Sequence, residues 1–182
     1  MVNLGPTAKY IPRPGDIGLT QISGAGGRLI RLGQWLNGDG YADYEHAFVV
    51  VKNDAPGDTD CMIVEAMPGG ARQVLNWHDP LRTVYLRCPE EYRAAVARAA
   101  RGFTGVPYSV ADYLYLAAHR LRIPAPHLRR YIRDSKHMIC SQLADEAANL
   151  GGWHLFDDGR WEGDVTPGDL KKLYDAQRKA SR

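Results

Sequence analysis

The first half of the chain carries short apolar runs separated by clusters of Gly, Pro, Asn and Asp, a pattern typical of strands joined by turns. A first strand is predicted over residues 15–22 (GDIGLTQI). Four strands in antiparallel order are predicted after it, the first two as a hairpin around the loop NDAPGD, over residues 45–52, 60–67, 71–76 and 83–88.

After Pro89 the apolar residues recur at intervals of three and four, the period of an amphipathic helix. This spacing predicts helices over residues 91–103, 109–121, 127–134, 138–150 and 166–180, and a shorter one earlier at residues 28–36. Strands followed by helices, with no clear boundary between two parts, indicate a single α+β domain over residues 1–182.

Composition narrows the function classes. With 45% hydrophobic and 24% charged residues, the chain is an ordinary globular protein. A net charge of +2 does not favour nucleic acid, and the basic run HLRRYIR at residues 127–133 is typical of a solvated helix face. Three scattered cysteines argue against a disulfide framework. Without a signal-type apolar core or a run of about 18 apolar residues, we expect a cytoplasmic protein with no membrane span.

Cys140 stands at the predicted start of a helix, in the segment SKHMICSQLADEAANLGG. The unpaired backbone N–H groups and the positive end of the helix dipole meet a cysteine there. That environment stabilises thiolate over thiol, which makes a cysteine nucleophilic at neutral pH. A small buried cysteine at a helix start is the competing interpretation.

A cysteine nucleophile needs a base and a group that orients the base. His46 begins the predicted strand EHAFVVVK, and Glu65 lies inside the apolar strand MIVEAM. If the loop between these strands closes symmetrically, Val51 faces Asp60 and His46 lies directly opposite Glu65. Facing residues have Cβ atoms roughly 4.5–5.5 Å apart, so Glu65 could hold the imidazole. The pairing would also explain a carboxylate in an apolar strand, because an unpaired buried charge is costly.

Other candidates fit less well. Cys61 is predicted to be core, and Cys88 is a rival nucleophile at a helix start without an obvious base. His78, in the turn NWHDPL, is a poor base candidate. His137 and Cys140 are three residues apart, but two ligands without a companion pair do not make a zinc site. SGAGGR lacks the Lys-Ser/Thr of a phosphate loop.

The order His46, Glu65, Cys140 resembles that of the circularly permuted NlpC-like papain-fold amidases, the YiiX-like group. RPGDI at residues 13–17 is similar to the family's opening strand, EHAFVVV to its histidine strand, and IVEAMPGGARQV to the following strand-turn-strand. GVPYS, ICSQLADEA and VTPGDL resemble the segments before a helix, around the cysteine and at the closing element. Gln142 stands where the family pattern leads us to expect an acidic residue.

The resemblance implies a permuted papain-like fold, a small antiparallel sheet or half-barrel packed against helices. It makes Cys140 the nucleophile, His46 the general base and acid, and Glu65 the orienting residue; Tyr108 either lines the cleft or simply packs. The implied activity is a cysteine hydrolase or acyltransferase that cleaves an amide-type bond through an acyl-enzyme, with no cofactor or metal. Its substrate would be a peptide, a peptidoglycan stem peptide or a lipid amide. The alternative is a catalytically inactive binding module on the same scaffold.

Overall fold

The computed structural model describes residues 10–21, 44–54, 61–67, 69–107, 138–160 and 164–181. Five strands and three helices lie within these ranges, and they confirm the predicted α+β class. The elements are β1 (Ile17–Thr20), β2 (His46–Lys52), β3 (Met62–Met67), β4 (Gly70–Leu75), β5 (Thr83–Leu86), α2 (Arg93–Gly102), α5 (Cys140–Leu150) and α6 (Pro167–Ala180).

The strands form one antiparallel sheet in the order β4-β3-β2-β1-β5. β1 is shorter than predicted because a turn precedes it, in which Gly15 has a φ of 91° and the Asp16 carboxylate accepts the Arg13 N–H. β5 also ends early, since the Arg87 N–H donates to the Gln177 side chain of α6 and the Cys88 N–H to Asp16. A local turn therefore sets the start of β1, whereas contacts with distant segments set the end of β5.

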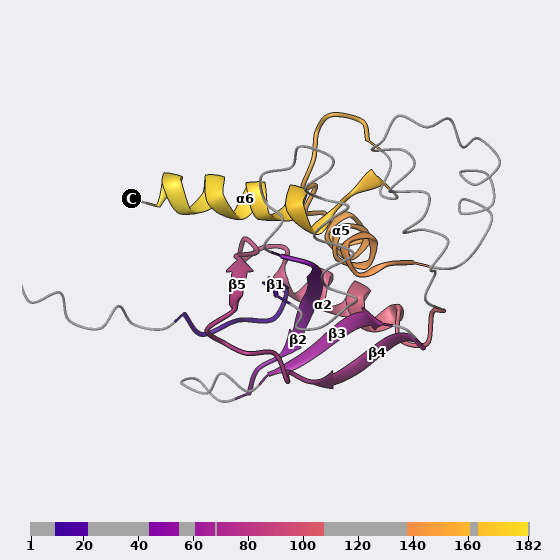
Figure 1. Cartoon of the computed structure of the whole chain (residues 1–182). Coiled ribbons are helices and arrows are strands. Elements are labelled where there is room, and N and C mark those ends of the chain that lie inside the picture. The colour runs from indigo at the N-terminus through magenta and orange to yellow at the C-terminus, as the bar shows by residue number, and fades with distance from the viewer. Residues whose placement is uncertain are drawn as a thin grey trace, which may run out of the picture.

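One face of the sheet is covered by the helices (Figure 1). Alternate residues of the central strands pack with apolar residues of α2, α5 and α6 into one core, because successive side chains of a strand point to opposite faces. This core includes Ile17, Leu19, Ala47, Val49, Val51, Val64, Ala66, Val96, Ala97, Leu143, Ala144, Ala147 and Leu170. Cys140, at the start of α5, belongs to the same core.

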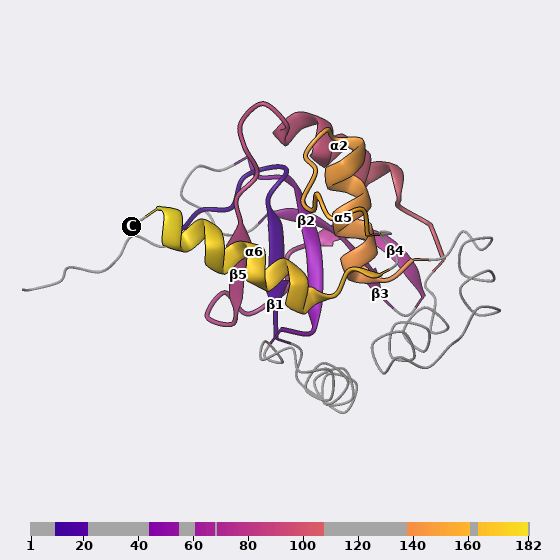
Figure 2. The same ribbon diagram turned by 90° about the horizontal axis from the view of Figure 1, so that it is seen from above.

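α2 and α5 lie side by side over the sheet, while α6 runs across β5 and β1 (Figure 2). Gly151, just after α5, permits the close approach of α2. A Cβ added there would lie 2.5 Å from the Cγ2 atom of Val96 and 2.7 Å from its backbone nitrogen. Thr166 caps α6, accepting the Asp169 N–H while the Asp169 side chain accepts the Thr166 N–H, the reciprocal arrangement of a capping box.

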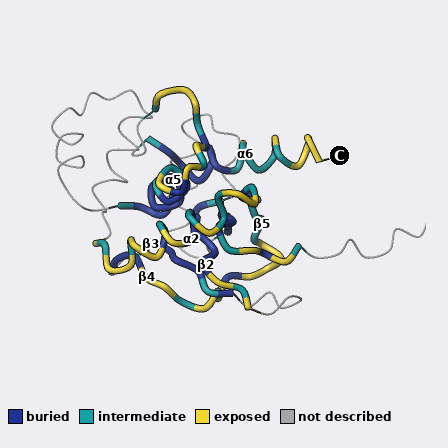
Figure 3. Tube along the Cα trace, turned by 180° about the vertical axis from the view of Figure 1, so that it is seen from behind, coloured by how far each residue is buried: buried dark blue, intermediate teal, exposed yellow. Residues whose placement is uncertain are grey.

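The opposite face has a second, smaller buried cluster of Phe48, Val50, Cys61 and Ile63. Phe48 lies across β1 at Gly18, where an added Cβ would come within 2.1 Å of the phenyl ring, so β1 needs glycine at this position. The edge strand β4 is largely exposed beyond its first two residues (Figure 3). Cys61 is therefore a core residue, as predicted.

The predicted hairpin register is wrong by two residues. Phe48, not His46, is the partner of Glu65, because the first pair beyond the loop is Lys52 with Met62, so the loop does not close symmetrically. An irregularity between Val50 and Lys52 then changes the register by one residue, as a bulge does. A two-residue change preserves the alternation of faces, so His46 and Glu65 remain on one face as diagonal neighbours.

The predicted helices over residues 28–36, 109–121 and 127–134 lie outside the described residues, as do Tyr108 and His137. None of the helices within the described ranges combines the length and apolar character that crossing a membrane requires.

Candidate active site

Cys140 is the first residue of α5 and is buried. The preceding residue, Ile139, is extended, with φ −99° and ψ 170°, and its N–H donates to the Gln142 side chain over 2.8 Å. No acidic side chain occurs in the first turn of the helix. The positive end of the helix dipole therefore meets the sulfur without a carboxylate to neutralise it. The predicted position of Cys140 at a helix start is confirmed.

His46 is the first residue of β2, and its Nε2 atom lies 2.9 Å from Oε2 of Glu65. Burial disfavours the imidazolium, but charge attraction and a hydrogen bond to Cys140, together with the hydrogen bond to Glu65, outweigh burial. These interactions raise the pKa of His46 to about 9. Because Nε2 is engaged by Glu65, Nδ1 is the nitrogen left to face Cys140. Coupling of this kind favours the thiolate–imidazolium form of a cysteine–histidine pair.

Glu65 is fully buried, yet its carboxylate is surrounded by donors. Oε1 accepts from Nε and Nη2 of Arg72, at 2.9 and 2.7 Å, and from the Trp77 indole at 3.0 Å. Oε2 contacts the Nε2 atoms of His46 and His78. Burial alone would raise the pKa of Glu65, but hydrogen bonds from His46, His78 and Trp77 prevail and hold it far below its usual value. Glu65 is therefore an anion at any physiological pH.

His78 is the residue that sequence reasoning missed. It is buried, its Nε2 atom lies 3.0 Å from Oε2 of Glu65, and its ring stacks on Phe48 with centroids 4.9 Å apart. Arg72 was also missed, although it stands directly opposite Glu65 across the two-residue turn between β3 and β4. The sequence signal for both residues was the carboxylate of Glu65 inside an apolar strand. One imidazole does not compensate a desolvated carboxylate, so further donors were to be expected.

Within the described ranges, one group of side chains has donor atoms close enough together to hold a metal ion, namely His46, Glu65 and His78. One ligand atom each of His46, Glu65 and His78 lies within 4.8 Å of the others. Those atoms already satisfy one another as hydrogen-bond partners. The Arg72 guanidinium also binds the same carboxylate and opposes a second cation there. The arrangement thus fits a hydrogen-bonded cluster better than a metal centre.

The other two cysteines lack such an environment. Burial raises the pKa of the Cys88 thiol to about 12, against the opposing effect of Arg93, and its sulfur donates to the Pro89 carbonyl. Cys61 lies in the smaller core cluster, where the Asn76 amide contacts its sulfur. None of these three cysteines, all within the described residues, forms a disulfide bond. Of the three, Cys140 is the one coupled to a histidine.

The chain matches no model of a known protein family, and no curated protein is significantly similar to it.

Proposed function

We propose that the protein is a cysteine hydrolase or acyltransferase that cleaves an amide-type bond through an acyl-enzyme, with Cys140, His46 and Glu65 as its catalytic unit. The observation that carries the proposal is the contact of Cys140 with His46 at the mouth of α5, on an imidazole whose other nitrogen is held by Glu65. These two contacts support the roles of Cys140 as nucleophile, His46 as base and Glu65 as orienting group.

The chemistry follows from these positions. The Cys140 thiolate attacks the carbonyl carbon, and the carbonyl oxygen becomes an oxyanion that the Cys140 N–H at the helix start is placed to stabilise. When the C–N bond breaks, the His46 imidazolium gives its proton to the leaving amine. His46 then takes a proton from water, or from an acceptor alcohol or amine, which attacks the thioester and releases the Cys140 sulfur.

Glu65 supports His46 without taking its proton. It remains ionised throughout, because Arg72, Trp77 and His78 also donate to its two oxygens. A fixed carboxylate holds the imidazole with Nε2–H toward itself and stabilises the imidazolium that forms after proton transfer.

A permuted papain-like architecture is part of the proposal. It is supported by the chain order His46, Glu65, Cys140 and by a cysteine helix packed on the antiparallel sheet that carries the other two residues. By the family resemblance, the substrate is a peptide, a peptidoglycan stem peptide or a lipid amide.

The direct test is competition among the three cysteines for iodoacetamide near neutral pH, followed by mass spectrometry. Cys140 should be alkylated well before Cys61 or Cys88. Labelled peptidoglycan fragments, acyl-amides and isopeptides are then screened with wild type and Cys140→Ala. Equal or slower alkylation of Cys140, with no turnover that depends on it, would reject the enzyme in favour of a binding module.

A further inference from the structure

Two histidines share one carboxylate oxygen beside Cys140. Oε2 of Glu65 lies 2.9 Å from Nε2 of His46 and 3.0 Å from Nε2 of His78, and the two imidazole rings have centroids 5.2 Å apart. All three side chains are buried. Only His46 is used by the proposed reaction, so the second histidine requires an explanation of its own.

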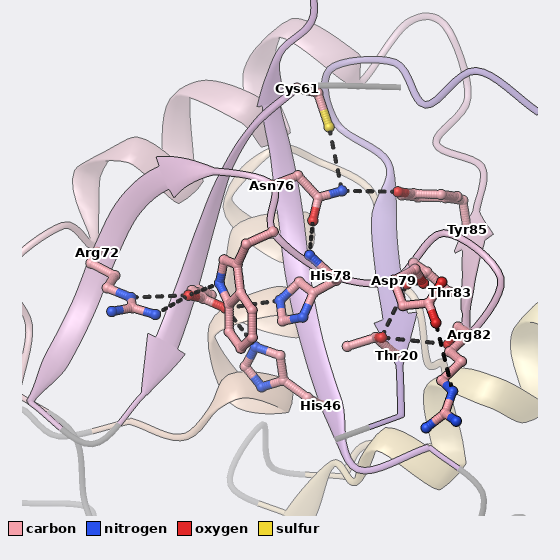
Figure 4. A network of polar contacts seen from close by, with 12 residues as sticks. Thr20, His46, Cys61, Arg72, Asn76, His78, Asp79, Arg82, Thr83 and Tyr85 are labelled. Carbon is pink, nitrogen blue, oxygen red and sulfur yellow. Dashed lines mark hydrogen bonds and ion pairs between the residues drawn. The ribbon is translucent and has the colours of Figure 1, made fainter. Parts of the chain in front are cut away.

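The loop that carries His78 is fastened to the sheet at both ends (Figure 4). At its start, the Asn76 side chain accepts the His78 N–H and donates to the Tyr85 hydroxyl. At its end, the Thr83 hydroxyl lies 2.8 Å from the Asp79 carbonyl and 3.0 Å from the Thr20 hydroxyl. Thr20 is the β1 partner of His46. His78 is thus anchored on the strands that surround the proposed base.

Neighbouring groups also decide the protonation of His78. An ionised carboxylate accepts hydrogen bonds, so Nε2 of His78 must carry the hydrogen. Burial, aided by the nearby positive charges of His46 and Arg72, lowers the pKa of His78 against the pull of Glu65 and keeps the ring neutral. Phe48 stacks on this ring at an interplanar angle of 12°, and the ring centroids of Trp77 and His78 are 4.3 Å apart. The ring is therefore fixed in place by its contacts as well as by its hydrogen bond.

We propose that His78 is a positioning residue of this site, a neutral Nε2–H donor that holds Oε2 of Glu65 in place so that Glu65 keeps His46 turned toward Cys140. The inference rests on the proposed function. Arg72 and Trp77 fix the other oxygen, Oε1. His78 is thus the donor that sets the direction of the oxygen His46 uses, and it does so without adding a second cation that would compete with the imidazolium.

Two substitutions separate the hydrogen bond from the packing. His78→Phe keeps an aromatic ring against Phe48 and Trp77 but removes the donor. His78→Gln removes the ring but places an amide N–H near the position of Nε2. His154→Phe, at an exposed histidine, is the matched control. Each protein is alkylated with iodoacetamide between pH 4 and 9, and the pH at which the Cys140 rate falls to half is compared, together with the melting temperature.

In His78→Phe the midpoint of the acidic limb should move up by about one pH unit, about a tenfold loss of thiolate in that range, as expected for one hydrogen bond to a charged group. His78→Gln should restore at least half of that shift, and His154→Phe should leave the midpoint unchanged. A wild-type midpoint in His78→Phe, or an equal shift in both His78 variants, would overturn the proposal.

The histidine ring nitrogens of the wild-type protein provide a test that needs no variant to fold. Their ¹⁵N chemical shifts near pH 7 should report His78 as a neutral Nε2–H imidazole; a cationic ring or an Nδ1–H tautomer would overturn the inference. Failure of the underlying function looks different. In that case wild-type Cys140 shows no preferred alkylation and no response to His46→Ala, whereas failure of this inference leaves both intact.

Discussion

Two buried carboxylates lie near two buried cysteines, Asp16 near Cys88 and Glu65 near Cys140. The two regions differ in the groups that compensate the carboxylate. Asp16 is held by the Tyr10 hydroxyl, by the N–H groups of Arg13 and Cys88, and by the Arg93 guanidinium at 2.7 Å. Glu65 is held by two imidazoles, an indole and a guanidinium. Both anions are compensated, but among the partners named here only those of Glu65 include groups that exchange protons near neutral pH.

The two cysteines also differ in their environments. Cys88 precedes α2 and donates its N–H to Asp16, and burial and the nearby acids raise its pKa to about 12 despite Arg93. Cys140 begins α5 and is coupled to His46, which Glu65 supports. Cys140 is the first residue of α5, whereas Cys88 lies five residues before Arg93, where α2 begins. A histidine between the acid and the sulfur further distinguishes Cys140. The first region links the start of β1 to α2, and the second carries the catalytic unit proposed above.

Removal of each sulfur should give the largest difference in turnover between the two regions. Cys140→Ala should abolish turnover of any substrate that the wild type cleaves, a loss of about 10³-fold or more, because no other group forms the acyl-enzyme. Cys88→Ala should keep the wild-type rate. Rates are measured on the substrate found in the screen, with circular dichroism to verify folding. Wild-type turnover by Cys140→Ala would show that Cys140 is not the nucleophile.

His46 should matter almost as much as the sulfur. His46→Ala is expected to lower turnover by about 10²–10³-fold, and Cys140→Ala combined with it should be scarcely worse, since residues of one catalytic unit are strongly non-additive. His154→Ala, at an exposed histidine, is the control. Losses that multiply in the double variant would mean that the two residues act separately.

Exchanging each carboxylate for its amide should separate activity from stability. Glu65→Gln and Asp16→Asn each leave buried donors without their anion, so each should lower the free energy of unfolding by about 3 kcal/mol in urea titrations. Only Glu65→Gln should also slow alkylation of Cys140 at pH 6, by about tenfold, because only Glu65 supports the imidazolium. An equal slowing in Asp16→Asn would remove the distinction between the regions.

The pH dependence gives a further contrast. The pKa of His46 is raised from 6.5 to about 9, chiefly by Cys140 against the effect of burial. For His46 alone, the raised pKa contributes stability that is complete below about pH 6.5 and is lost as the pH rises through about 9. Monitored by NMR, His46 should titrate near pH 9 in the wild type, and about one unit or more lower in Cys140→Ala. The same midpoint in both proteins would contradict the ion pair.

Much of this arrangement is predictable because it depends on local pattern. The apolar runs around His46 and Glu65 predict two strands of the sheet, and the helical spacing after Cys140 predicts α5 at nearly its observed start. Alternation also places His46 and Glu65 on one face even though the register is wrong, since a shift of two residues keeps the face.

What sequence could not provide depends on distant contacts. His78 reaches Glu65 only because Asn76 ties its loop to Tyr85 and to Cys61, and no local motif encodes those bonds. The asymmetric closure of the hairpin, with Lys52 opposite Met62, and the bulge between Val50 and Lys52 are likewise properties of the assembled sheet. Arg72 is the exception, because the two-residue turn between Met67 and Gly70 implies its position opposite Glu65.

The smallest expected effect concerns the charge at the mouth of α5. Gln142 is buried and accepts the Ile139 N–H, so it completes the helix start with a neutral amide. Gln142→Glu can accept the same hydrogen bond but adds a negative charge one turn from the sulfur, where it competes with the thiolate for the positive helix end. The free energy of such a charge at a helix terminus, about 0.3–1 kcal/mol, predicts a two- to fivefold slower alkylation of Cys140 at a pH on its acidic limb. Asn149→Asp, at the far end of α5, adds the same charge away from the sulfur and should change the rate far less. If Gln142→Glu reacts as fast as the wild type, the neutral cap is only structural, and the reactivity of Cys140 rests on His46 alone.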